Sequence, residues 1–444
     1  MTNQLADIQK EVFARRPVLK QINHEYFGAC LEDYVKDCWQ VPAAGPDEVF
    51  LNIVKAEAEA IYGVDAAKKI ISLLVKKALV SSIDHLGIWG HPIFVNADLI
   101  YSLHFEAEDY PLALATESVS LNNTSSWSAS LLWHNDAGDL ERSSFFADKF
   151  KTQPVFSCPV IKARDIERFQ SATGRRFEAL IDILGIRKTS ALNFSVQACQ
   201  ASQKFWQAVF PSAPKLTYLP LETIVSKYLL KVFENPEHVL SKIVLTQKGR
   251  RLWEKYFSGE HTLMFWAIDG KGRRQAITTL PENLADSLKK RQIYPSSPLC
   301  FMALLYAGLA CAGGFTQTTW LTEVKAKFSA LLSDLETGDG QIDSISGIPT
   351  QNFAESSLAW LSIAGKYLSP SAVDLYLTGQ DYYPQYSKLA GHLTLGQSLA
   401  LAMPTIYSVV TPKAEQFEGF NLGKLQDRVF EEAGMENSLA LTGF

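Results

Sequence analysis

The sequence predicts an α/β protein with a layered core, flanking helices and a mainly helical C-terminal region. An apolar run at 78–83 leads into a loop with glycines, then a helix that opens at Pro92, then a second apolar run at 112–116. Amphipathic helical spacing precedes this unit, and Asp65–Lys77 runs directly into the first strand. A strand, a helix and a strand in succession, surrounded by further helices, are typical of an α/β layer.

The composition is that of a globular chain large enough to build its own core. It has 444 residues, of which 47% are hydrophobic and 20% charged. At roughly 100–200 residues per domain, two or three domains are expected. We predict an N-terminal helical segment that packs on the core (1–74), an α/β core that carries the site (75–280) and a helical C-terminal region (281–444).

Charge, cysteine usage and hydropathy narrow the class of protein. The net charge of −5 and the absence of a basic tract argue against a nucleic-acid partner. Six scattered cysteines without a CxxC pair are typical of a reducing compartment. The most apolar stretch, 299–314, is shorter than the ~20 residues that span a bilayer, and the N-terminus lacks the pattern of a signal peptide. We therefore expect a cytoplasmic protein with no membrane partner.

The remaining elements are predicted from periodicity and from turn residues. Strands are expected at 127–134 and 155–158, helices within 165–210, and a short strand at 217–219 before a helix through 233. A hairpin and a series of helices follow, with strands 261–268 and 274–279, helices 282–292, 299–312, 320–335, 353–367 and 393–403, and a loop near 338–340. The glycines at 313–314 are interpreted as the C-cap of a buried helix.

The segment between the first strand and the first core helix carries the predicted site. Asp84 and His85 follow the strand, at the edge of an open α/β sheet where ligands bind. Gly87 and Gly90 permit backbone turns that let a ligand approach closely. His91 occupies the cap position of the helix, beside free amides and the positive end of the helix dipole. These features suit an anionic oxygen, and we predict Asp84, His85 and His91 as catalytic residues.

Three uses of these histidines are open. They can donate protons to a developing negative charge. They can instead ligate a divalent metal together with Asp84, with His104 or His134 completing the set. Because the separation of His85 and His91 is not a standard zinc spacing, we predict that the site holds no metal. The alternative is a metal site formed by Asp84, His85, His91 and His104. In the structural interpretation, both imidazoles cap local backbone, and His104 packs among its apolar neighbours.

Seven further residues are predicted to bind the substrate. Two are the loop glycines, three are polar side chains near turns, and two form an arginine pair in the hairpin turn, where guanidinium groups suit phosphate or carboxylate. For the polar side chains and the arginines, an ordinary solvated turn is the competing interpretation. The residues are Gly87, Gly90, Asn122, Asn123, His134, Arg273 and Arg274.

The order strand, His-Leu-Gly-Ile-Trp-Gly-His-Pro, helix, strand resembles the start of the Rossmann-like core of HIGH-motif nucleotidyltransferases over about 45 residues. It is closer to bacillithiol-synthase-type ligases, whose first strand enters a loop of the form Gly-Gln-Gln-x-Gly-Leu-x-x-Gly-Pro. Gly87 and Pro92 fall in comparable places, whereas Asp84 and His85 stand where that pattern has glutamines, and His91 stands where it has the glycine before its proline. There is no true His-x-Gly-His. The resemblance implies a Rossmann-like layered core and group transfer or ligation.

The leading prediction is therefore a cytoplasmic α/β enzyme that acts on a small anionic metabolite by group transfer or ligation. A nucleotide is one of the cofactors that such an enzyme can use. The alternative is a metal-dependent hydrolase or lyase in which the same histidines are ligands. A second alternative is a non-catalytic ligand-binding or scaffold protein, in which these residues cap backbone.

Overall fold

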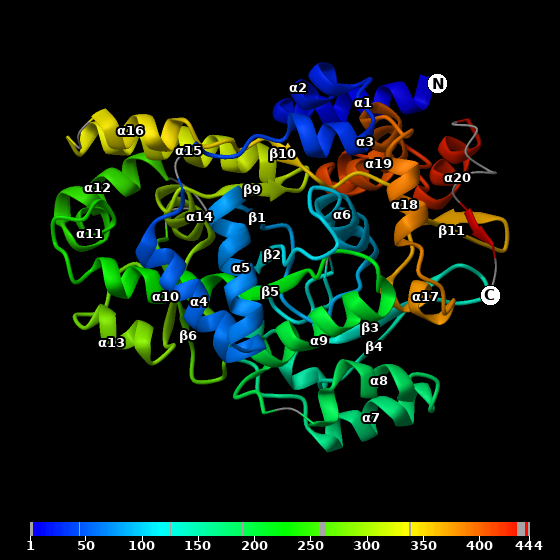
Figure 1. The fold of residues 1–444 in the computed structure, drawn as a ribbon, viewed down its shortest axis with the longest axis horizontal. Helices are drawn as coiled ribbons and strands as arrows, with labels where there is room; N and C mark the ends of the chain where they lie inside the picture. The colour runs from blue at the N-terminus through cyan, green and yellow to red at the C-terminus, as the bar shows by residue number, and fades with distance from the viewer. Residues whose placement is uncertain are drawn as a thin grey trace.

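A five-stranded sheet organises the fold, in the order β10–β9–β1–β2–β5, and all of its pairings are parallel (Figure 1). Its members are β1 (Leu79–Ser81), β2 (Leu112–Ala115), β5 (Thr217–Pro220), β9 (Ala310–Gly313) and β10 (Asn352–Phe353). The predicted α/β class is confirmed. The structure is a computed structural model, and it describes residues 3–43, 45–124, 126–188, 190–257, 263–336, 339–432 and 440–442.

The central strands are buried on both faces. β1, β2 and β9 consist of buried residues throughout, as is typical of parallel sheets that helices cover on each side. β1 lies between two neighbours, because Ser81 pairs with Ala113 on one side and with Ala312 on the other. A bridge between His85 and Thr116 continues the pairing of β1 with β2 beyond the strand ends.

The strand order reverses at β1. The chain passes from β1 through α6 (Pro92–Ser102) to β2 and then to β5 on one side, whereas β9 and β10 lie on the other side. The connections that leave the carboxyl ends of β1 and β9 therefore run in opposite directions. Open α/β sheets have a ligand crevice at such a position.

The N-terminal part of the chain is helical, as predicted. It forms α1 (Asn3–Arg15), α2 (Pro17–Tyr26), α3 (Leu31–Asp33), a π-helical turn (Tyr34–Cys38), α4 (Glu48–Tyr62) and α5 (Val64–Lys77). α4 packs on α5, on α9 (Phe194–Val209) and on α10 (Leu221–Val232). α1 and α2 pack against α19 (Leu395–Val410). The N-terminal helices thus contact segments from distant parts of the chain.

The described part of the chain contains three smaller sheets, and two of them are formed by the middle of the sequence. β3 (Ser130–His134) pairs with β4 (Leu140–Ser144), and β6 (Phe265–Ile268) pairs with β7 (Arg274–Ala276) and β8 (Ile293–Pro295), all antiparallel. The predicted hairpin at 274 is confirmed, and His261 of its predicted first strand lies outside the described residues. The helices here are α7 (Ala163–Thr173), α8 (Glu178–Leu184), α11 (Val239–Leu245), α12 (Gln247–Tyr256) and α13 (Leu284–Lys289), with 3-10 turns at Asp148–Phe150 and Ile186–Lys188.

The strand predicted at 155–158 is wrong. Val155–Ser157 is a single 3-10 turn. Pro154 and Pro159 flank it, and proline cannot donate to a strand ladder, so an apolar run of this length between two prolines does not join a sheet.

Of two further helices predicted in the C-terminal region, the first is confirmed only up to Tyr306, and the second is wrong. Residues 299–312 divide into α14 (Ser297–Tyr306) and β9, because the chain turns at Gly308 with φ +79°. Residues 353–367 contain β10, β11 (Trp360–Ile363) and the start of β12 (Lys366–Leu368). The core sheet therefore uses strands from beyond residue 280, and residues 281–444 are not a separate helical region.

The remaining C-terminal elements are mainly helical. They are α15 (Gln317–Asp334), α16 (Asp339–Ser346), α17 (Ala372–Leu377), α18 (Tyr383–Ala390), α19, a 3-10 turn at Lys413–Glu415, α20 (Leu422–Glu432) and β13 (Ala440–Thr442), which pairs with β11. The loop predicted near 338–340 is helical at 339–340, and Gly338 lies outside the described residues.

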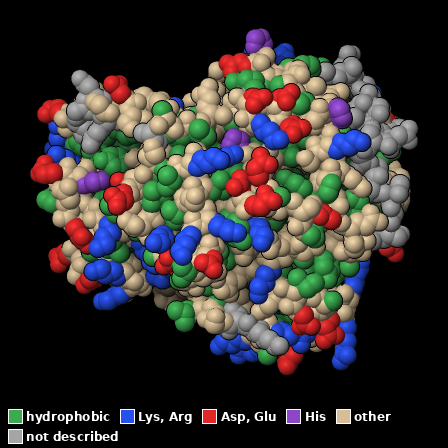
Figure 2. Space-filling model, viewed as in Figure 1, with side chains coloured by type: hydrophobic (Ala, Val, Ile, Leu, Met, Phe, Trp, Pro, Cys, Tyr) green, Lys and Arg blue, Asp and Glu red, His purple; other side chains and the backbone are tan. Residues whose placement is uncertain are grey.

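The surface carries both charges. Acidic and basic side chains are interspersed on the face that Figure 2 shows, including the area over α4 and α5. Among the helices in the described part of the chain, none combines the length and the apolar composition that a membrane crossing requires.

A buried carboxylate joins the end of β2 to three other elements. Glu117 accepts hydrogen bonds from the Thr223 amide (2.8 Å) and from Ser195 Oγ (2.6 Å). Arg291, which lies before β8, forms an ion pair with it at 3.4 Å. The Glu117 amide in turn donates to Glu222 Oε2 (2.8 Å). These contacts hold α9, α10 and the second small sheet against the core.

We expect Glu117→Ala to lower the free energy of unfolding by roughly 3 kcal/mol or more, because it leaves buried donors and Arg291 without their acceptor. Urea denaturation followed by circular dichroism measures this. Glu167→Ala, at an exposed position of α7, is the control and should change the free energy by less than about 0.5 kcal/mol. Equal effects of the two substitutions would contradict the role given to Glu117.

Candidate functional site

The crevice expected from the strand order is a cleft of about 520 Å³. This volume lies within the ~300–1,000 Å³ range of small-molecule sites. The floor comes from the carboxyl ends of the core strands: Ser82, Ile83 and His85 after β1, Thr116, Ser118 and Val119 after β2, Gly314, Phe315, Thr316 and Gln317 after β9, and Glu355 after β10. The other lining residues are Ile93 and Phe94 of α6, Arg274 of β7, Ser297 and Phe301 of α14, Trp320 of α15 and Val409 of α19.

His85 is the one predicted catalytic residue that lines this cleft. Its backbone is fixed by the bridge to Thr116, and its ring packs edge-to-face against Phe94 with centroids 5.6 Å apart. Burial lowers the pKa of His85 to about 4. The imidazole is therefore neutral near pH 7 and carries one N–H donor and one nitrogen acceptor.

Glu355 places a carboxyl group in the same cleft. Its Oε2 accepts a hydrogen bond from the Phe315 amide (3.0 Å). A Cβ at position 314 would lie 2.1 Å from Oε2, so a side chain at this position would displace the Glu355 carboxyl group. Burial raises the pKa of Glu355 to about 8. At neutral pH this carboxyl group retains its proton and can donate it.

Gln317, the first residue of α15, connects the segment after β9 to the end of β1. Gln317 Nε2 donates to the carbonyl oxygen of Ser82 (2.7 Å) and to Ser82 Oγ (2.9 Å). The first turn of α15 is therefore held against the end of β1. The glycines at 313–314 were predicted to cap a helix, and this prediction is wrong. They lead from β9 into α15.

Arg274 lines the cleft and also an adjoining hollow with more polar walls. Its guanidinium group stacks on Trp266, with the ring centroid 4.1 Å away. Arg273 borders the hollow and forms an ion pair with Asp269 at 2.9 Å. Asn123 borders the hollow as well. The structure thus brings together three of the predicted substrate-binding residues, next to the cleft that contains His85.

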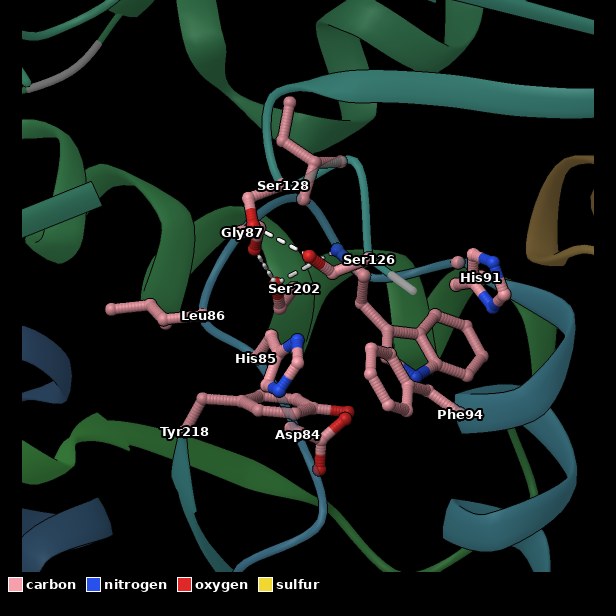
Figure 3. A pocket seen from close by; sticks show the side chains of 13 residues that line it. Asp84, His85, Leu86, Gly87, His91, Phe94, Ser126, Ser128, Ser202 and Tyr218 are labelled. Atoms are coloured by element: carbon pink, nitrogen blue, oxygen red, sulfur yellow. Dashed lines mark hydrogen bonds between the residues drawn. The ribbon is translucent and has the colours of Figure 1, made fainter. Parts of the chain in front are cut away.

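The rest of the predicted site folds around a much smaller cavity of about 10 Å³, which has room for about one water molecule (Figure 3). His91 Nδ1 accepts a hydrogen bond from the Ile93 amide (3.3 Å), so His91 caps α6. Phe94 packs against both imidazoles, with centroid distances of 5.6 Å and 5.7 Å. Burial, and secondarily His85, lowers the pKa of His91 to about 4. The imidazole of His91 is therefore neutral at neutral pH.

The loop glycines serve the packing of the loop. A Cβ on Gly87 would lie 2.2 Å from the carbonyl oxygen of Ser128, so the space expected for a ligand is filled by this segment. Ser202 Oγ donates to the Gly87 carbonyl oxygen (2.6 Å) and accepts from the Trp89 amide (3.0 Å). Gly90 has φ +146°, which glycine adopts most readily.

Asp84 belongs to a buried carboxyl pair that sequence reasoning missed. Trp89 Nε1 and the Tyr218 hydroxyl both donate to Asp98 Oδ2, at 2.8 Å and 2.9 Å. Burial raises the pKa of Asp98 to about 7. Burial, and then the charge of Asp98 and a hydrogen bond with it, raise the pKa of Asp84 well above its usual value. Because two adjacent buried carboxylates repel each other, the pair retains a proton.

His104 and His134 lie away from the cleft and have structural partners. His104 Nδ1 donates to the Val35 carbonyl oxygen (2.7 Å), and its ring stacks on Trp39. His134 Nδ1 donates to Asp374 Oδ2 (2.7 Å), which joins β3 to α17. In the described part of the chain, no three His, Cys, Asp or Glu side chains are arranged to hold a metal ion. The alternative ligand set of Asp84, His85, His91 and His104 is therefore not assembled.

The polar segment after β2 is only partly near the site. Asn122 is exposed and accepts a hydrogen bond from Ser120 Oγ (2.8 Å), an ordinary turn contact. Ser125 lies outside the described residues. Of this segment, Ser118, Val119, Ser120 and Asn123 border the cleft or the hollow.

Sequence reasoning missed Glu355 and Gln317. A signal for Gln317 was present, because two glycines before a long helix are typical of a strand–turn–helix connection at a ligand site. Glu355 follows a core strand of only two residues, which leaves no periodic pattern.

Comparisons with protein-family models, with curated proteins and with solved structures found no match.

The Asp84–Asp98 pair predicts a pH dependence of stability. Because the folded pair holds a proton that the unfolded chain releases above about pH 4, the folded state binds more protons between roughly pH 4 and 7. The contribution of the pair to the free energy of unfolding of the protein should therefore fall as the pH rises through this window. The expected decrease is on the order of 1 kcal/mol per pH unit.

Urea denaturation across pH 4–8 measures this contribution when the wild type is compared with the double variant Asp84→Asn/Asp98→Asn. His85, His91 and His104, whose pKa values are lowered to about 4, have the opposite effect on the free energy of unfolding, and this effect is present in both proteins and cancels. Parallel curves for the two proteins would rule out a shared proton.

Proposed function

We propose that this protein is an enzyme that transfers or joins a group on a small anionic metabolite, with the cleft as its active site. The observation that carries the proposal is the position of the cleft at the carboxyl ends of β1, β2, β9 and β10, where the strand order reverses. In open α/β sheets this is the usual place for a ligand.

The strand order supports a Rossmann-like core. When the core strands are numbered along the chain, their order in the sheet is 3-2-1-4-5, as in the first five strands of dinucleotide-binding sheets. This agrees with what the resemblance to HIGH-motif nucleotidyltransferases and bacillithiol-synthase-type ligases implies. A nucleotide is accordingly one of the anions that the proposal includes.

The proposed chemistry uses three groups. Glu355, whose pKa is raised to about 8, donates a proton to a leaving group. His85 is neutral and orients the reacting group through hydrogen bonds from its ring. Arg274 supplies positive charge for a phosphate or carboxylate. All three line one cleft. Asp84 and His91 keep supporting roles, since they hold the loop that carries His85.

The first expected outcome concerns binding. Inorganic pyrophosphate or a nucleotide at 100 times its Kd should stabilise the folded protein by about 2.7 kcal/mol, which a thermal shift assay detects as a rise in Tm. Arg274→Ala should abolish the shift. The control is Lys271→Ala, which also removes one positive charge, from the exposed turn before β7, but lines neither cavity. Equal shifts in both variants would place the anion elsewhere.

The second outcome separates an enzyme from a binding protein. The wild type should deplete particular anionic metabolites from a cell extract over time, as measured by mass spectrometry. Glu355→Gln should slow this roughly 10²–10⁴-fold, the usual contribution of a general acid. Glu323→Gln, at an exposed position of α15, is the matched control. Copurified anion without any metabolite turnover by the wild type would favour a non-catalytic binding protein.

A further inference from the structure

Two adjoining cavities of opposite character meet at Arg274. The cleft has mostly apolar walls above its polar floor, whereas the hollow is lined by Ser118, Val119, Ser120, Asn123, Thr152, Pro154, Asp269, Arg273, Arg274 and Gln275. The cavities share Ser118, Val119 and Arg274. A single ligand can therefore lie across the boundary, with one end in each cavity.

The apolar walls are formed by side chains that the protein has already buried. Phe301, Phe315 and Phe94 are only 3%, 5% and 7% exposed. Phe301 packs edge-to-face on Trp320 with centroids 5.1 Å apart, which fixes the orientation of both rings. At the rim, Val409 is 57% exposed. An apolar ligand in the cleft would cover Val409 and remove its surface from water.

The boundary between the two cavities carries the positive charge of Arg274. In the described part of the chain, Arg274 forms no ion pair with a carboxylate, and its stacking on Trp266 fixes the plane of the guanidinium group. The neighbouring Arg273 is neutralised by Asp269, whose carboxylate also accepts the Arg273 and Lys271 amides at 2.8 Å. Both oxygens of the Asp269 carboxylate thus accept hydrogen bonds from Lys271 and Arg273. The guanidinium group of Arg274 remains available to bind the anionic group of a ligand.

We infer that the substrate is an amphiphilic anion, with a phosphate or carboxylate head bound by Arg274 and an apolar acyl or alkyl part in the cleft. This inference rests on the proposed function and narrows it to one class of substrate. A head at Arg274 places the adjoining part of the ligand over the polar floor, where His85 and Glu355 lie. The apolar part then contacts the aromatic walls and Val409.

A series of alkyl phosphates tests this inference. Binding of inorganic phosphate and of butyl, hexyl and octyl phosphate, each below its micelle-forming concentration, is measured by isothermal titration calorimetry. Each added pair of methylene groups should raise the affinity roughly tenfold. 1-Octanol, which lacks the head group, should bind at least tenfold more weakly than octyl phosphate.

Two variants assign the two ends of the ligand. Arg274→Ala should remove the preference for octyl phosphate over 1-octanol, whereas Lys271→Ala should retain it. Val409→Asp should reduce the affinity for octyl phosphate at least tenfold and leave inorganic phosphate unchanged. Its control is Val75→Asp, since both valines lie in the last turn of a helix and are 57% and 53% exposed. Melting temperatures of all variants check that the fold is retained.

The outcomes separate this inference from the proposed function. Arg274-dependent binding of phosphate with no dependence on chain length would overturn the amphiphilic class and leave an anionic metabolite. Binding of no anion at all would overturn both. Chain-length dependence that survives both Arg274→Ala and Val409→Asp would place the ligand at another site and overturn the inference.

Discussion

The pairing of β9 with β1 is the constraint on which the rest of the molecule depends. It joins residues more than 200 positions apart in the sequence, since Ser81 pairs with Ala312. Without it, β1 would be an edge strand and no crevice would exist at its carboxyl end. With it, the turn after β9 lies beside the end of β1, and Gln317 fastens the two through its hydrogen bonds to Ser82. The cleft therefore follows from the topology of the sheet.

Polar residues near this pairing have one of two roles, and the burial of each side chain determines which role it has. Asp84 and His91 are enclosed: the Asp84 carboxyl group is paired with that of Asp98, and His91 accepts a hydrogen bond from the Ile93 amide. His85, between them in the sequence, lines the cleft. The enclosed groups are still important for the site, because a buried polar group without a partner would destabilise the loop that positions His85.

The sequence allowed prediction of the α/β class and of the first β–α–β unit, because these depend on local periodicity and on glycine and proline. It did not allow prediction of the full sheet. β9 is the small-residue run Ala-Cys-Ala-Gly, which is equally compatible with a helix, and β10 has two residues. Only tertiary pairing makes them strands. Glu355 was missed for the same reason, and the close packing of Ser128 against Gly87 is a tertiary contact that no local pattern predicts.

The electrostatics of the cleft follow from how each ionisable group is buried. A histidine whose pKa is lowered to about 4 and a glutamate whose pKa is raised to about 8 are both uncharged at pH 7. The floor of the cleft is then polar but neutral, and the positive charge at its boundary comes from Arg274. A neutral floor avoids repulsion of an incoming anion, and a cation at the boundary determines which end of the ligand stays outside the cleft. Recognition at the boundary and proton transfer at the floor can therefore operate on one molecule without the two sets of groups neutralising each other.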